Sequence, residues 1–486
     1  NAATAPANPE RSGYTFSGWD KAFSNVTSDL IVTAKYTINN DDQGGGSSTG
    51  DTPTPTSTAK LSPAPTPTTA PKPTPVPTSA PGSSNVVITQ GQNTLIATGT
   101  TQAIVDEKGR AATTFTQEQA SEIIKKALEE TQKQQKGTTT GIEFRVETDK
   151  AASDVKASLP KTAIDEAAQK ELKALTMSSP VASLTFDSDA LNTISQQSSA
   201  DVIISMAKVD TETLSEETQE MIGDRPVFDF SVTSGDKVIS QFDGNVSVSV
   251  PYSPKPDEDM NAIVIYFINA QGELEVITDC FYDPATGNVR FTTSHFSQYA
   301  VGYNKVGFND VSANAWYHNA VSFIAARNIT RGTGNSSYNP DAKLTRGEFL
   351  VMVMRAYGME PDENPEDNFV DAGDTWYTGY LAAAKRLGIS KGIGDNRFAP
   401  EKNITRQEMF TLLYNTLKAV GKLPSGEDGQ PLNTFVDADK IASWAKEAID
   451  KLVRAGIIKG SNGNLLAEDS STRAEMAQVL YNLLSK

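Results

Sequence analysis

One sequence phrase occurs three times after residue 300, and this repetition limits the fold more than any other feature of the chain. Each copy has a Phe-x-Asp opening, a tryptophan, a glycine turn and Thr-Arg-x-Glu ahead of an apolar segment. The matching arginines stand at positions 346, 406 and 473, which are 60 and 67 residues apart. Such a period predicts one supersecondary unit used three times, whose copies bury one another's apolar faces.

The Thr-Arg-x-Glu phrases predict three capped helices. A threonine that accepts from a backbone N–H, with a glutamate three residues later that reaches back to the cap, forms a capping box. The boxes begin at Thr345, Thr405 and Thr472. The residues that follow have helical spacing and predict a single apolar stripe on each helix, as in Met409, Leu412, Leu413 and Leu417.

The arginine of each phrase is expected to bind an anion. It lies in the first helical turn, where the helix dipole disfavours a cation at a cost of roughly 0.3–1 kcal/mol. An arginine beside free backbone N–H groups suits a carboxylate, which it can bind through two parallel hydrogen bonds. The alternative is a solvated arginine paired with a nearby aspartate such as Asp310 or Asp371, but three copies favour the anion site.

The tryptophan and the glycine of each copy are consistent with a sugar ligand. Trp316, Trp376 and Trp444 either stack on a sugar face or anchor the core, and the sequence leaves both readings open. The glycines are expected to end the preceding helices in left-handed geometry and to let a ligand approach the backbone. They stand at Gly332, Gly392 and Gly460.

The three units resemble S-layer homology domains, the anchors of bacterial surface proteins. The resemblance rests on the glycine turns, such as 388–392, on the loops Tyr338-Asn339-Pro340 and Phe398-Ala399-Pro400, and on the Thr-Arg-x-Glu phrases. It implies an all-α pseudo-threefold bundle that binds a secondary cell wall polymer linked to peptidoglycan through terminal pyruvylated N-acetylmannosamine. The ligand residues it implies are Asp310, Trp316, Gly332, Arg346, Asp371, Trp376, Gly392, Arg406, Asp437, Trp444, Gly460 and Arg473. The third unit departs from the pattern, because its loop 464–469 has neither the aromatic residue nor the proline.

Length and charge limit the remaining possibilities. A chain of 486 residues is expected to form about three domains. Its net charge of −17 argues against nucleic acid, which needs clustered Lys and Arg. A single cysteine, Cys280, excludes an intramolecular disulfide, and there is no apolar run long enough to predict a membrane span. We expect an extracellular protein of a Gram-positive type of cell surface, of which this chain is a fragment preceded by a further catalytic or adhesive domain.

The sequence predicts a multidomain organisation with six segments. Residues 1–37 resemble part of a Listeria–Bacteroides surface repeat, a small β-rich module expected here in truncated form. Residues 38–85 are first Gly/Ser-rich and then Pro/Thr-rich, which is typical of a semi-rigid linker. Residues 86–303 are expected to form an α+β or β-sandwich spacer domain. The three repeats are assigned to residues 304–366, 367–430 and 431–486.

Within the predicted spacer domain, Thr116 to Gln119 should open a helix with Ile123 and Ile124 on its apolar face. A second helix is expected from Ala163 to Leu175. Alternating or buried apolar runs predict strands at 142–146, 246–250, 262–268, 274–277 and 289–291.

No catalytic site, metal site or cofactor is predicted. The two histidines and one cysteine are too few for a typical zinc site, and a Cys280–His295 dyad lacks an orienting residue. The acidic run Asp257-Glu258-Asp259 is expected to be solvated. The main hypothesis is therefore a non-catalytic cell wall anchor that tethers an upstream surface domain. The alternative is the C-terminal anchoring part of a cell-bound polysaccharide-degrading enzyme. A catalytic role for residues 86–303 is a third possibility.

Overall fold

The computed structural model describes residues 14–19, 34–38, 86–91, 94–134, 138–170, 172–424 and 429–485. The chain divides into two compact units, Asn1–Pro73 and Thr74–Lys486. In the first unit, β1 (Tyr14–Trp19) pairs antiparallel with β2 (Ala34–Ile38). The rest of the module predicted at 1–37, and the linker predicted at 38–85 apart from residue 38, lie outside the described residues.

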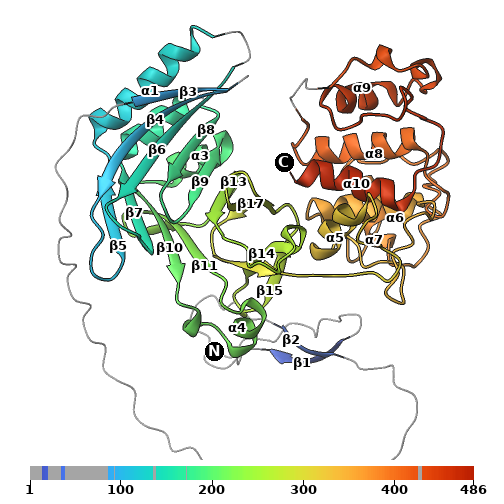
Figure 1. The fold of residues 1–486 in the computed structure, drawn as a ribbon, viewed down its shortest axis with the longest axis horizontal. Coiled ribbons are helices and arrows are strands. Elements are labelled where there is room, and N and C mark those ends of the chain that lie inside the picture. The colour runs from blue at the N-terminus through green and yellow to red at the C-terminus, as the bar shows by residue number, and fades with distance from the viewer. Residues whose placement is uncertain are drawn as a thin grey trace, which may run out of the picture. The chain divides into compact units, whose positions relative to one another are not determined.

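Two mixed β-sheets form the region between Val86 and Tyr303, which we call the middle region (Figure 1). From edge to edge, the first sheet contains β16 (Phe281–Asp283), β17 (Asn288–His295), β13 (Gln241–Pro251), β9 (Ser183–Asp187), β8 (Ala174–Ser178), β6 (Thr139–Thr148), β4 (Thr94–Ala103) and β3 (Val86–Gln90). The second contains β15 (Leu274–Ile277), β14 (Ile263–Ile268), β18 (Gln298–Tyr303), β11 (Val227–Ser234), β10 (Val202–Val209), β7 (Asp154–Leu159) and β5 (Arg110–Thr114), with β12 (Lys237–Ile239) paired to β11.

The predicted strands are confirmed, and their alternation explains the sheets. In β13, every second side chain between Phe242 and Val250 is buried, so one face of the strand packs on the core. The core joins both sheets through a group of aromatic rings. Phe296 lies 5.0 Å from Phe242 of the first sheet and 5.9 Å from Phe230 of the second, measured between ring centroids. The middle region is therefore β-rich, as predicted.

The helices of the middle region are α1 (Gln117–Thr131), α2 (Lys161–Gln169), α3 (Ser188–Gln197) and α4 (Glu216–Ile222), with the short turns η1 (Thr211–Thr213) and η2 (Met260–Ala262). The predicted start of α1 is confirmed, because Thr116 and Gln119 form a capping box. The predicted second helix is wrong at its end. It stops at Gln169, and Leu175 lies in β8 because pairing with β6 and β9 buries alternate residues there.

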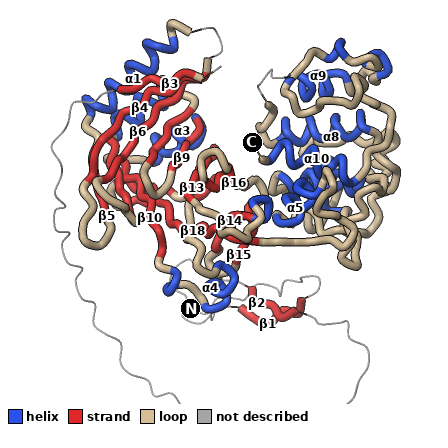
Figure 2. Tube along the Cα trace, viewed as in Figure 1, coloured by secondary structure: helices blue, strands red, loops and turns tan. Residues whose placement is uncertain are grey.

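Within the described residues, the repeats contain six α-helices, two in each. Figure 2 shows helices of the repeats in blue, joined by tan loops. These helices are α5 (His318–Ala326) and α6 (Arg346–Ala356), α7 (Thr378–Arg386) and α8 (Arg406–Ala419), and α9 (Lys446–Arg454) and α10 (Arg473–Leu484), with η3 (Leu432–Thr434) and η4 (Ala438–Lys440) in the third copy. One apolar core runs through all three repeats. The predicted single stripe is wrong for α6, where six consecutive residues, 349–354, are buried. Neighbouring elements therefore cover this helix on every side.

Backbone hydrogen bonds join the repeats in a closed cycle just before α6, α8 and α10. Ile404 N donates to Leu344 O at 2.9 Å, Ser471 N to Ile404 O at 3.3 Å, and Leu344 N to Ser471 O at 3.0 Å. We call these three residues and their bonds the backbone ring. The last helix also returns to the first, because Tyr481 of α10 packs edge-on against Phe323 of α5 with ring centroids 5.2 Å apart. Each repeat thus contacts both others.

The side chain of Arg327 joins the middle region to the first repeat. It is completely buried and lies at the C-terminus of α5. Its Nε donates to Cys280 O at 2.7 Å, and its terminal nitrogens donate to Asn261 O and Ile263 O, both at 2.9 Å. The guanidinium also lies 3.4 Å from the centroid of the Phe323 ring. A buried cation needs such partners, so the donors of Arg327 hold the two regions together.

Candidate functional site

The three capping boxes are confirmed. Thr345, Thr405 and Thr472 each accept from the backbone N–H three residues later, at 3.2, 3.4 and 3.2 Å. In return, the glutamates at 348, 408 and 475 accept from the threonine N–H groups at 2.8 to 2.9 Å. The boxes therefore fix where α6, α8 and α10 begin.

The prediction that the arginines lie beside free N–H groups is wrong. The first two N–H groups of each helix donate to a loop of another repeat. At α6, Arg346 N donates to Lys402 O at 2.9 Å and Gly347 N to Pro400 O at 2.8 Å. The matching bonds at the other helices are Arg406 N to Asp469 O, Gln407 N to Ala467 O, Arg473 N to Ala342 O and Ala474 N to Pro340 O. A neighbouring loop occupies the position expected for an anion.

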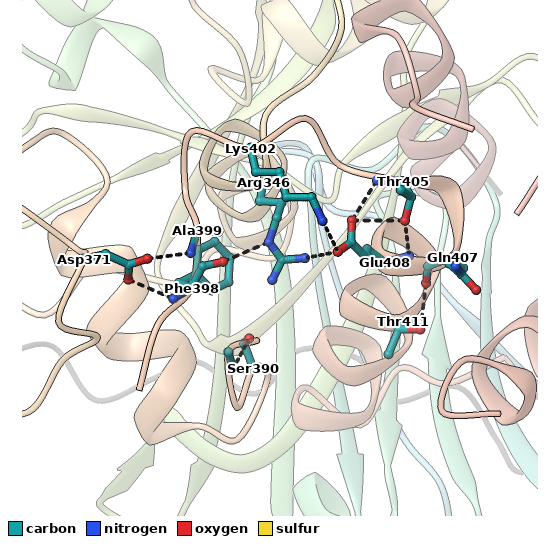
Figure 3. A network of polar contacts seen from close by, with 11 residues as sticks. Arg346, Asp371, Ser390, Phe398, Ala399, Lys402, Thr405, Gln407, Glu408 and Thr411 are labelled. Carbon is teal, nitrogen blue, oxygen red and sulfur yellow. Dashed lines mark hydrogen bonds and ion pairs between the residues drawn. The ribbon is translucent and has the colours of Figure 1, made fainter. Parts of the chain in front are cut away.

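The three arginines are paired within the protein instead. Arg346 is 4% exposed; its Nε donates to Phe398 O at 2.9 Å and it pairs with Glu408 at 3.1 Å (Figure 3). In the same way, Arg406 contacts Leu465 O and Glu475, and Arg473 contacts Tyr338 O and Glu348. Their partners are thus the capping glutamates of another repeat, and not Asp310 or Asp371 as the alternative reading proposed. These ion pairs offset the unfavourable dipole of the first turn.

The three aspartates hold a strained loop in each repeat. In the second repeat, Asp371 accepts from Phe398 N at 2.8 Å and from Ala399 N at 2.9 Å (Figure 3). Ala399 has a φ of 58°, which an L residue rarely adopts. Asp310 and Asp437 bond their loops in the same way, and Asn339 and Leu466 share the positive φ at 54°. The third loop therefore keeps this geometry although its sequence departs from the pattern.

These aspartates should make the repeats sensitive to acid. Burial raises the pKa of Asp371, but hydrogen bonds from Phe398 and Ala399 outweigh it, so the pKa lies below its ordinary 3.8; Asp310 and Asp437 behave alike. Because the unfolded carboxyl is protonated first, their stabilisation is complete above the unfolded pKa and is lost as pH falls through the lower folded pKa. Thermal unfolding followed by circular dichroism should show a midpoint that drops below about pH 4. Asp371→Asn should flatten that dependence, and an unchanged midpoint down to about pH 2 would contradict the prediction.

The three predicted glycines have left-handed geometry, as expected, but they lie beyond the ends of the helices. Gly332, Gly392 and Gly460 have φ values of 76°, 77° and 65°. They do not end the helices, since the left-handed residues directly after the helix C-caps are Asn328, Gly388 and Gly456. The later glycines fold the turn back on the protein. A Cβ on Gly460, for example, would lie 2.6 Å from both Phe435 and the carbonyl oxygen of Asn464.

All three tryptophans of the repeats are exposed. Trp316, Trp376 and Trp444 have 62%, 58% and 55% of their surface accessible. The reading of these residues as core anchors is therefore wrong, and their rings are open to a ligand. Trp316 and Trp376 each pack edge-on against the following tyrosine, which holds the ring in place.

One groove brings together predicted residues from all three repeats. It has a volume of about 930 Å³ and is lined by Arg346 of the first repeat, the turn 387–393 and one side of α8 in the second, and Trp444 of the third. We call it the second-repeat groove, after the repeat that supplies most of its wall. In this groove, the predicted arginine, glycine and tryptophan therefore come from three different repeats. Gly392 lies in this groove with Arg346 and Trp444, whereas Asp371 holds the loop beside it.

Sequence reasoning missed one cation in each repeat. Arg331, Lys391 and Lys459 directly precede the turn glycines, and all three are exposed. Within the described residues, none of them makes a hydrogen bond or ion pair, in contrast to Arg346, Arg406 and Arg473. Lys391 lines the second-repeat groove. The signal was visible in the sequence, because a cation stands before the glycine in all three copies.

Cys280 and Glu258, which the sequence analysis considered as a catalytic and a solvated residue, are both enclosed by the protein. Cys280 is completely buried, and burial raises the pKa of its thiol. The expectation that the run 257–259 is solvated is wrong for Glu258. Its side chain is only 2% exposed, pairs with Arg225 and accepts from Tyr252 Oη at 2.6 Å.

Comparison with known protein families gives one domain match in each repeat. The model of the S-layer homology domain matches residues 307–350, 368–410 and 434–477. The chain is similar to an amylopullulanase of Thermoanaerobacterium thermosulfurigenes, with 30% identity over 258 residues, which is 52% of this chain and 14% of that protein. It is also similar to exoglucanase XynX of Acetivibrio thermocellus, with 34% identity over 184 residues, 37% of this chain and 16% of that protein.

Similar proteins also include an S-layer protein. The S-layer protein sap of Bacillus anthracis is 30% identical over 173 residues, which is 36% of this chain and 20% of that protein. The chain thus spans a fifth or less of the length of these three relatives. The alignment with the exoglucanase is about as long as the three repeats together, whereas the 258-residue alignment with the amylopullulanase is longer than the repeats. Among the described residues, no helix has the length and apolar character needed to cross a bilayer.

Proposed function

Because this chain is a cell-surface, cell-wall-associated protein with three S-layer homology domains, we propose that its repeats form one non-catalytic wall anchor. The proposed ligand is a secondary cell wall polymer ending in pyruvylated N-acetylmannosamine. The proposed architecture is a pseudo-threefold bundle that spans the predicted segments 304–366, 367–430 and 431–486, with 86–303 as a spacer. The backbone ring and the cyclic arginine–glutamate pairs support this architecture.

The second-repeat groove is the observation that carries the proposal. An exposed tryptophan, Trp444, offers a flat ring for a sugar, and Lys391 offers a cation with no partner within the described residues. The groove also holds Ser390, which turns its hydroxyl to Gly392 N at 3.1 Å and so fixes the turn. We propose that Lys391 binds the pyruvyl carboxylate. Arg346 then acts at the base of the groove by positioning Glu408 and the loop at Phe398.

The twelve residues predicted from the sequence have two proposed roles. The tryptophans are proposed to contact the sugar, together with Arg331, Lys391 and Lys459. The aspartates, the glycines and the three arginines of the phrases are proposed to shape the grooves, because their polar groups already contact protein or their backbone is tightly folded. The net charge of −17 does not oppose an anionic ligand, since screening at physiological ionic strength limits remote charges to about 8 Å.

A binding isotherm on purified cell walls tests the proposal. The chain should bind walls that carry the polymer and lose this binding when the pyruvyl groups are removed. Lys391→Ala should weaken binding by roughly one to two decades, because a hydrogen bond to a charged group is worth about 1.5–3 kcal/mol. Lys459→Ala should have the smaller effect of the two, because its turn carries Ile458 where the others have a hydroxyl.

Two controls separate ligand binding from folding. Lys237→Ala removes an exposed lysine of the middle region that lies outside the grooves and should leave the isotherm unchanged. Thr405→Ala should lower the free energy of unfolding by about 1 kcal/mol through the lost cap, with little change in affinity. Equal binding of pyruvylated and stripped walls would refute the polymer, and unchanged affinity after Lys391→Ala would refute the role of this lysine.

The relatives favour a second reading of what the repeats anchor. Since two of them are named as an amylopullulanase and an exoglucanase, the repeats are also proposed as the anchor of a cell-bound polysaccharide-degrading enzyme. Both readings assign the same task to this chain. Assaying the chain against starch, cellulose and wall glycans tests the remaining possibility that the middle region is catalytic, because reproducible turnover would make this chain an enzyme.

A further inference from the structure

A second cavity lies where the first repeat meets the middle region. It has a volume of about 670 Å³, and we call it the junction cavity. Its wall from the first repeat includes Asn328, Arg331, Arg355 and Met359. These positions correspond by the 60-residue period to Gly388, Lys391, Asn415 and Ala419, all of which line the second-repeat groove. The junction cavity is therefore the first repeat's counterpart to the outer part of that groove.

The opposite wall comes from the middle region and has no counterpart in the second-repeat groove. It is formed by β14, β15 and β17 through residues such as Phe267, Val276 and Ser294. Ser294 is exposed to the cavity and makes no hydrogen bond with its side chain among the described residues. The second-repeat groove, by contrast, is lined by repeat residues alone.

The two walls are held at a fixed distance. Besides the bonds of Arg327, Asn304 Nδ2 donates to Ala326 O at 2.6 Å. Thr278 Oγ1 donates to Ala356 O at 3.3 Å, and Lys422 pairs with Asp279 at 2.6 Å. In the second repeat, the residue equivalent to Arg327 is Leu387, which is 40% exposed. The contacts of Arg327 that hold this cavity open against the middle region therefore belong to the first repeat and are not repeated at the equivalent position of the second.

The chemistry of the junction cavity suits sugar hydroxyls. Arg327, which also lines the cavity, already donates to carbonyls, and Lys422 pairs with Asp279. The charged groups that remain for a ligand are two arginines, Arg331 and Arg355, and two glutamates, Glu275 and Glu360, whose charges balance. Arg355 Nε donates to Tyr380 Oη at 3.2 Å, which leaves its other nitrogens for a ligand. Phe267 adds an aromatic surface and carries His295 edge-on at 4.8 Å. Mixed donors and acceptors beside an aromatic ring fit a neutral saccharide better than a phosphate.

We propose that the junction cavity binds uncharged sugar residues of the wall polymer, next to the acidic terminal unit. The middle region then acts as part of the receptor as well as a spacer. This inference rests on the proposed wall-binding function, which supplies the acidic unit in the first repeat's groove. It predicts that the chain distinguishes a longer glycan from the terminal sugar alone.

Titration calorimetry on the full chain tests the inference with three probes. They are pyruvylated N-acetylmannosamine, the same unit extended by two N-acetylhexosamines, and uncharged chitotriose. The extended probe should bind one site roughly tenfold more tightly than the monosaccharide, as expected for one or two added hydrogen bonds. Ser294→Trp places a large side chain in the cavity from the wall opposite Arg331, and it should abolish this gain while leaving the monosaccharide affinity unchanged. Ser240→Trp, at another exposed serine of the middle region, should keep the gain.

The outcomes separate this inference from the proposed function. If the extended probe gains nothing, or if its gain survives in Ser294→Trp, the junction cavity is not a sugar site. If neither pyruvylated probe binds, the proposed polymer is wrong, and chitotriose then decides. Binding of chitotriose that Ser294→Trp removes would support the cavity alone, and its absence would overturn the cavity too.

Discussion

Removing residues 435–486 should unfold the two repeats that remain. Leu344 N would lose its acceptor Ser471 O, Glu348 would lose Arg473, and the partly buried Arg406 would lose both Leu465 O and Glu475. Water would reach these groups once the third repeat is gone, so each lost hydrogen bond costs about 0.5–1.5 kcal/mol, and more when a group is charged. The truncation also exposes apolar side chains of the shared core, at about 25 cal/mol per Å². Together these losses approach the roughly 5–15 kcal/mol that stabilises a whole domain. Circular dichroism should show the helical signal of the repeats melting without a cooperative transition.

A cut chain provides the matched control. A protease site inserted between Pro424 and Gly429 would leave the third repeat present but no longer joined covalently. The cut protein should stay folded, because every contact across the repeats is retained. Adding the fragment 429–486 to the truncated chain should likewise restore the transition. A truncated protein that melts cooperatively at the parent's midpoint would show that the repeats are independent domains.

Arg327→Leu should uncouple the middle region from the repeats. The change places the residue of the equivalent second-repeat position, Leu387, at the junction. Three carbonyls at the junction then lose their donor, and each buried carbonyl left without a partner costs about 1–3 kcal/mol. Differential scanning calorimetry should resolve separate transitions for the two regions where the parent shows them together.

The control for this variant is Arg386→Leu, one residue before the equivalent position. Arg386 is 59% exposed and pairs with Asp362 at the surface, where such pairs contribute about 0–1 kcal/mol. Its loss should leave the calorimetric profile nearly unchanged. If Arg327→Leu also melts as the parent does, the two regions are not coupled through this side chain.

Local signals in the sequence predicted the parts of the fold that depend on neighbouring residues. The capping boxes at Thr116 and Thr405 were readable because both partners lie within four residues of each other. The end of α2 could not be predicted in this way, because the strands that pair with Leu175 lie elsewhere in the chain. The burial of α6 on all sides was missed for the same reason, since the covering elements come from other repeats.

The candidate site shows the same division. Sequence alone indicated a cation in the first turn at Arg346, but it could not show that Glu408 of the next repeat neutralises it. Lys391, which has no partner among the described residues, directly precedes a predicted glycine, but the sequence does not single it out because an exposed lysine is ordinary. Partner relations across the repeats decided which of the two cations is available.

The backbone ring also bears on how an anchor withstands pulling. In a linear array, a force applied at one end detaches one module at a time, and each break is small. Here the chain enters the repeats through α5, and α10 from the far end of the sequence packs against that same helix at Phe323 and Tyr481. Tension on the N-terminal side is therefore shared by the first and last helices, and the three interfaces must fail together. Because the contacts form a closed circle, we expect the three repeats to resist tension as one unit.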